Sequence, residues 1–123
     1  MKSNPNEYKE VIEKLLEKTR QRKVDWEQAY SSSFRCTLAG GPESFYFTIS
    51  HSGGSNFEAE TFTLQMSDQR ENIIFEASTN DLPTSRAEEE ISQMIQEIYD
   101  IARRQALRVE RKLEQASALL DQV

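Results

Sequence analysis

The chain has 123 residues, with 15 lysines and arginines against 21 aspartates and glutamates, so its formal net charge at pH 7 is −6. Its mean hydropathy is −0.73, and no apolar run approaches the roughly 20 residues that a membrane-spanning helix needs. The first five residues lack the apolar core of a signal peptide. We therefore expect a single domain over residues 1–123, in the cytoplasm and without membrane contact. The single Cys36 cannot form an intramolecular disulfide, which fits a reducing compartment.

The first predicted element is an amphipathic helix that begins at Asn4 and Pro5, which suit the capping position and the first helical turn. Its apolar residues recur at helical spacing and are Tyr8, Val11, Ile12, Leu15 and Leu16. Basic residues crowd the final turns, where the helix dipole favours cations, so we expect the helix to end near Arg22 and to pack on a sheet. The lone Trp26 follows, and we expect it to close one end of the core.

Four strand-like runs come next, at residues 33–39, 43–52, 57–67 and 73–77. Apolar and polar residues alternate along them, which is typical of strands with one buried face. The third run changes phase, which indicates a β-bulge near Glu60 and Thr61. Because short turns join the runs, we predict antiparallel hairpins and hence a four-stranded meander with one apolar face.

Residues 85–120 are predicted to form one long amphipathic helix, opened by a capping box of Ser85 and Glu88. Its apolar stripe consists of Ile91, Ile95, Ile98, Ala102, Ala106, Val109, Leu113, Ala116 and Leu120. Such a helix would span roughly 50 Å, whereas a seven-residue strand spans roughly 24 Å. We therefore expect it to protrude and to need a partner, unless it breaks near Gln105 or packs back on the first helix. The stripe drifts between Ala102 and Val109, which is compatible with a bend.

No motif in the chain supports catalysis, a metal or a cofactor. Cys36 lies on the apolar side of its run, so we expect a buried core cysteine. Simple pairing of the first hairpin places Cys36 opposite Tyr46 or Phe47. The same pairing places His51 near Ser31, several residues along the ladder and too far for a Cys–His dyad. One His and one Cys cannot build a tetrahedral zinc site without carboxylates from elsewhere.

The candidate interaction surface is a cluster of cations in the last helix, which are Arg103, Arg104, Arg108, Arg111 and Lys112. On a continuous helix, Arg104, Arg108 and Arg111 share one face. The alternative interpretation is a solvated face with ion pairs to Asp100, Glu110 and Glu114. The acidity of the whole chain argues against non-specific binding of nucleic acid, because phosphate contacts need clustered cations. The local cluster of cations is nevertheless compatible with binding of nucleic acid.

Two segments resemble a group of small uncharacterised bacterial proteins, residues 15–27 (LLEKTRQRKVDWE) and residues 98–107 (IYDIARRQAL). This resemblance implies a helix, a β-meander and a terminal helix, and it implies no activity. The helix–strands–helix order is also similar to that of YbaB-type nucleoid-associated proteins, which are small acidic dimers with three strands. Its size, its acidity and the dimerisation we expect are similar to those of type III secretion chaperones. Those chaperones place a helix among their strands, and no such helix is visible in this sequence.

We therefore expect a two-layer α+β domain, with a helix, a four-stranded antiparallel meander and a long helix, and with both helices on one sheet face. The expected function is non-catalytic binding, as a small adaptor or regulator that forms a homodimer through the last helix. Two alternatives stay open. One is nucleoid-type binding of nucleic acid through the basic face of that helix, and the other is chaperone-like binding of a protein client.

Overall fold

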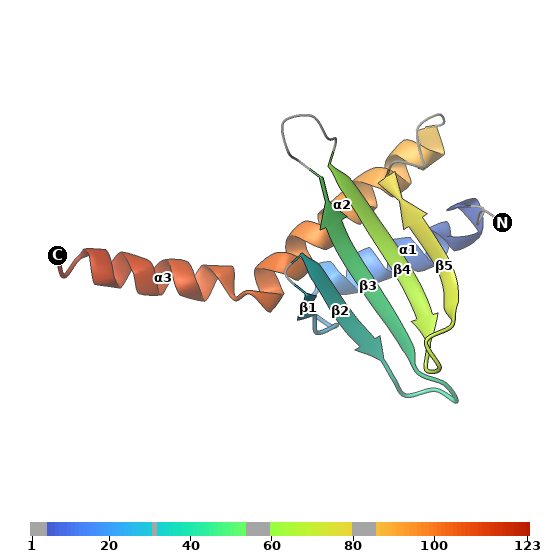
Figure 1. Cartoon of the computed structure of the whole chain (residues 1–123), viewed down its shortest axis with the longest axis horizontal. Helices are drawn as coiled ribbons and strands as arrows, with labels where there is room; N and C mark the ends of the chain where they lie inside the picture. The colour runs from blue at the N-terminus through green and yellow to red at the C-terminus, as the bar shows by residue number, and fades with distance from the viewer. Residues whose placement is uncertain (1–4, 31, 54–59, 80–85) are drawn as a thin grey trace.

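The computed structural model describes residues 5–30, 32–53, 60–79 and 86–123. The elements in chain order are α1 (Pro5–Arg20), β1 (Glu27–Tyr30), β2 (Ser33–Leu38), β3 (Phe45–Ser52), β4 (Thr61–Asp68), β5 (Ile73–Ser78), α2 (Arg86–Ala106) and α3 (Val109–Leu120). The strands form one antiparallel sheet in the order β1-β2-β3-β4-β5. Helices α1 and α2 pack against each other on one face of this sheet (Figure 1). The predicted α+β class and antiparallel meander are confirmed.

The core lies between the sheet and the two helices, because both helix stripes and one face of each central strand are buried. Its large buried side chains are Ile12, Leu15, Leu16, Phe34, Phe47, Ile49, Leu64, Phe75, Ile91, Ile95 and Ile98. Neighbouring strand residues such as Thr48 and Gln65 point the other way and are only half-buried. The sheet is therefore covered on one face, as its alternation predicts.

Ion pairs at the surface join α1 to α2. Lys9 Nζ lies 2.9 Å from Glu90 Oε2. Arg20 donates to both carboxylate oxygens of Glu97, and these hydrogen bonds hold the pKa of Glu97 below its usual value. Because all four side chains are partly exposed and screened by solvent, these pairs add little to stability. The packing of α1 against α2 is therefore stabilised mainly by the buried apolar residues of the two helices.

The prediction of four strands was wrong, because β1 adds a fifth. This strand pairs with β2 in antiparallel fashion, with Glu27 opposite Arg35 and Gln28 opposite Phe34. All four of its residues are exposed. An edge strand needs only backbone pairing, and without a buried face it shows no apolar alternation. The sequence pattern that revealed the other strands is therefore absent here.

The prediction of one continuous helix over residues 85–120 was also wrong. Helix α2 ends at Ala106, and Arg108 then adopts a left-handed backbone conformation with φ 53° and ψ 49° before α3 begins at Val109. The amide of Leu107 donates to the carbonyl oxygen of Arg103 over 2.9 Å, and the amide of Arg108 donates to that of Gln105 over 3.2 Å. These bonds close the last turn of α2. The residue proposed as its cap, Ser85, lies outside the described residues.

Helix α1 ends at Arg20, slightly before the predicted end near Arg22, because Arg22 is itself left-handed with φ 57°. The proposed cap Asn4 lies outside the described residues. Trp26 is buried, and its Nε1–H donates to Oγ1 of the buried Thr19 over 3.2 Å. Trp26 is therefore part of the core.

The predicted bulge near Glu60 and Thr61 was wrong. Strands β3 and β4 pair regularly from Ser52 opposite Thr61 onward. Strand β4 begins at Thr61, so the change of phase falls at its start and not inside it. Residues 57–59 of the predicted run lie outside the described residues. The irregularity that does occur in β4 lies between Met66 and Ser67, opposite β5.

Candidate functional site

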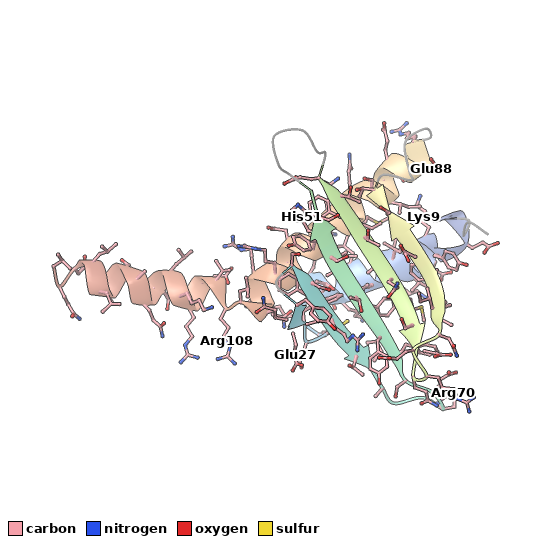
Figure 2. All side chains as sticks on the ribbon, in the orientation of Figure 1. Lys9, Glu27, His51, Arg70, Glu88 and Arg108 are labelled. Carbon is pink, nitrogen blue, oxygen red and sulfur yellow. The ribbon has the colours of Figure 1, made fainter. Side chains whose placement is uncertain are left out.

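Helix α3 extends away from the two-layer body and contributes no buried residue (Figure 1). Its leucines are largely exposed, with exposed fractions of 60% for Leu113, 62% for Leu119 and 72% for Leu120. The junction of α2 and α3, which we call the elbow, consists of Leu107 and Arg108. Figure 2 shows Arg108 at this point. The elbow directs a helix with exposed leucines into solvent.

A pocket of about 470 Å³ lies at the elbow, between the end of α1, the last turns of α2 and the first turn of α3. We call it the elbow pocket, and its lining residues are Arg22, Asp100, Ile101, Arg104, Gln105, Arg108, Glu110 and Arg111. Three of the five predicted surface residues, Arg104, Arg108 and Arg111, line it. The other two, Arg103 and Lys112, do not. Arg22 joins the cluster from the end of α1, and sequence analysis did not include it.

Only one arginine of the elbow pocket is paired. Arg104 Nε donates to Glu110 Oε1 over 3.2 Å. The pKa of Glu110 is lowered, first by the N–H of its own residue and, among side chains, by Arg104. Within residues 5–30, 32–53, 60–79 and 86–123, the guanidinium groups of Arg22, Arg108 and Arg111 form no hydrogen bond or ion pair. The predicted ion pairing with neighbouring acids therefore occurs for Glu110 only.

A hydrogen bond connects one wall of the elbow pocket to the chain segment before β1. Gln105 Nε2 donates to the carbonyl oxygen of Val24 over 3.3 Å. The oxygen of the same side-chain amide, Gln105 Oε1, is buried and accepts no hydrogen bond from the described residues. The hydrogen bond from Gln105 holds the end of α2 beside the segment that carries Arg22. Residues distant in the sequence therefore line one pocket.

Cys36 and His51 do not form a catalytic pair. Cys36 is buried opposite Phe47, as predicted, and burial raises the pKa of its thiol to about 12. The amide of His51 donates to the carbonyl oxygen of Ser32 over 3.1 Å, next to the predicted neighbour Ser31, which is itself not described. The imidazole packs against Tyr99, with ring centroids 5.5 Å apart. No group of three metal-ligating side chains occurs in the part of the chain that the structure describes.

Burial of Cys36 has a measurable consequence. At pH 8 a thiol with a pKa near 12 is thiolate in only about one molecule in 10,000, and the thiolate is the reactive form. We expect Ellman's reagent to modify the folded protein at pH 8 at least about 100-fold more slowly than the chain in guanidinium chloride. A Cys36→Ser variant, which should not react in either state, is the control. Rapid modification of the folded protein would contradict burial of Cys36.

None of the described helices has the length and apolar character needed to cross a membrane. Comparison of the chain with protein-family models, with curated proteins and with solved structures finds no match. The features of the fold that bear on function are α3 and the elbow pocket.

Proposed function

We propose that this protein is a non-catalytic interaction module that associates with a second copy of itself through α3. The observation that carries this proposal is a 12-residue helix without a single buried residue. Isolated helices shorter than about 12–15 residues are marginal in water, because nucleation is costly and most helical stability comes from packing. Pairing with another helix would supply the packing that α3 lacks in the monomer.

The spacing of the apolar residues in α3 supports a helical partner. Val109, Leu113, Ala116 and Leu120 follow one another in steps of four, three and four residues. This is the spacing of the a and d positions of a coiled coil, which align on one side of a helix. A second α3 presents the same apolar stripe, so the two surfaces are complementary in chemistry and in length.

The size of this stripe predicts weak association. Leu113 and Leu120 give four leucines in a pair of helices, and burying each one stabilises by about 1.5–3 kcal/mol, or about 6–12 kcal/mol together. Association costs about 4–15 kcal/mol in lost translational and rotational freedom. The two ranges overlap, so we expect a monomer–dimer equilibrium that depends on concentration and not a permanent dimer.

Sedimentation velocity over a wide concentration range tests the proposal. We expect the average mass of the wild-type protein to rise from that of a monomer toward that of a dimer. A variant with Leu113→Gln and Leu120→Gln should stay monomeric at every concentration, because it loses the apolar stripe. Ile73→Gln is the control, since Ile73 is also exposed (58%) but lies on β5, and it should associate like the wild type.

Two results would contradict the proposal. A wild-type protein that stays monomeric up to millimolar concentration would show that α3 does not pair with itself. Association of the Leu113 and Leu120 variant equal to that of the wild type would place the contact elsewhere. Circular dichroism of each variant would verify that the body of the domain is folded, which is expected because no α3 residue is part of the core.

A further inference from the structure

The elbow pocket has more cationic than anionic side chains. Four guanidinium groups line it, from Arg22, Arg104, Arg108 and Arg111, against the carboxylates of Asp100 and Glu110. Only Arg104 is engaged, through its hydrogen bond to Glu110. The local charge is therefore positive in a chain whose net charge is −6. Arg22 also acts on Glu110 through space and contributes to the lowered pKa of that carboxyl. Four guanidinium groups still share two carboxylates, and like charges repel one another, so this arrangement favours an anion that enters from outside.

Two of the unpaired arginines stand where the backbone is strained. Arg22 and Arg108 have φ values of 57° and 53°, in the left-handed region. That region disfavours residues with a Cβ atom, and glycine is the usual choice for it. Both positions carry arginine instead, one at the end of α1 and one at the elbow, and both side chains line the same pocket. A left-handed residue commonly ends a helix, and Glu71, with φ 65°, adopts the same conformation away from the pocket, so the case for a ligand depends on the arginine side chains.

We infer that the elbow pocket binds a compact phosphate-bearing anion, with Arg22, Arg108 and Arg111 as donors to its oxygens. A guanidinium group presents a planar fork of N–H donors that matches phosphate oxygens. A phosphate group carries nearly two negative charges at pH 7 and three acceptor oxygens, which suits several guanidinium groups better than one carboxylate does. The pocket volume of about 470 Å³ is that of a small-molecule site.

The surrounding charge favours a small ligand over a polymer. Asp100 and Glu110 stand in the same wall as the arginines, and the chain as a whole is acidic. An extended nucleic acid would also meet the acidic remainder of the chain, whereas a compact anion meets only the pocket, where four arginines outnumber two carboxylates. The three donors come from the segment after α1, from the elbow and from α3. This site does not depend on the pairing of α3.

Inorganic pyrophosphate is the first probe, titrated into the full chain by calorimetry at low ionic strength. We expect saturable binding with one site per chain. Arg22→Gln and Arg111→Gln should each weaken it about tenfold or more, since each removes hydrogen bonds from a charged donor. Arg111 has ordinary helical backbone, so its substitution leaves the elbow in place. Arg70→Gln is the matched control, because Arg70 is an exposed arginine in the turn between β4 and β5, and its affinity should equal that of the wild type.

A short single-stranded DNA oligonucleotide is the second probe, and it separates the two sources of phosphate. Tighter binding of pyrophosphate than of the oligonucleotide supports a compact ligand. Binding of the oligonucleotide without binding of pyrophosphate would overturn the inference in favour of a nucleic-acid surface. Absence of pyrophosphate binding at millimolar concentration would overturn it too, as would equal weakening by Arg70→Gln, which would indicate only general attraction between charges.

Discussion

Replacing Ile49 by alanine should lower the free energy of unfolding by about 2–5 kcal/mol. Ile49 is fully buried in β3, between β2 and β4, on the sheet face that α2 covers. The substitution removes apolar contacts and leaves a cavity that the surrounding side chains fill only in part. Because single domains are stable by only about 5–15 kcal/mol, the loss is a large share of the total. Urea unfolding followed by the fluorescence of Trp26 measures it.

The matched control for this prediction is Ile74→Ala. Ile74 is also a strand isoleucine, but it lies on the edge strand β5 and 44% of it is exposed. Its replacement should cost at most about 1 kcal/mol, the span of β propensity. Both variants lose the same atoms from the same type of element, so the difference between them reports burial alone. Equal losses would contradict a core on one side of the sheet.

The alternation of apolar residues was sufficient to predict most of the sheet and its buried face. A strand with one buried face must repeat its apolar residues every second position. Phe34 and Cys36 in β2, and Phe47 and Ile49 in β3, follow this rule and are all buried. The helical stripes of α1 and α2 are buried for the corresponding reason, since apolar residues three or four positions apart share one face.

The alternative of a break near Gln105 is close to the observed elbow at Leu107 and Arg108, although no Gly or Pro marks the position of the break. The chain turns through Leu107 and Arg108, and Arg108 takes up a left-handed conformation that its sequence gives no reason to expect. The one available signal was the drift of the apolar stripe between Ala102 and Val109. That drift arises because Ala102 is buried against the body while Val109 begins a helix that leaves it.

The arginine cluster was predicted only in part, because its members meet through tertiary structure. Spacing along a continuous helix grouped Arg104, Arg108 and Arg111, and these residues do line one pocket although the helix is broken between them. Arg22 comes from the end of α1 and reaches the pocket because α1 packs along α2. No local pattern connects it to the last helices. Its only signal was the group of basic residues at the end of the first predicted helix.

Replacing Trp26 by alanine should destabilise the domain by about 3–5 kcal/mol. Trp26 is only 3% exposed and closes the core between α1 and β1. Because this variant lacks the only tryptophan of the chain, unfolding should be followed by far-ultraviolet circular dichroism. A loss below about 1 kcal/mol, typical of surface substitutions, would contradict a packing role for the indole ring.

The hydrogen bond of Trp26 can be separated from its packing through Thr19, whose hydroxyl accepts from Nε1 in a buried site. Thr19→Val keeps the shape of the side chain but leaves the indole N–H without an acceptor, which should cost about 1–3 kcal/mol. Thr37→Val, at an exposed position of β2, is the control and should be nearly neutral. The expected order of destabilisation is therefore Trp26→Ala, then Thr19→Val, then Thr37→Val. If Thr19→Val proved as neutral as Thr37→Val, the bond would add nothing and packing alone would hold the indole in place.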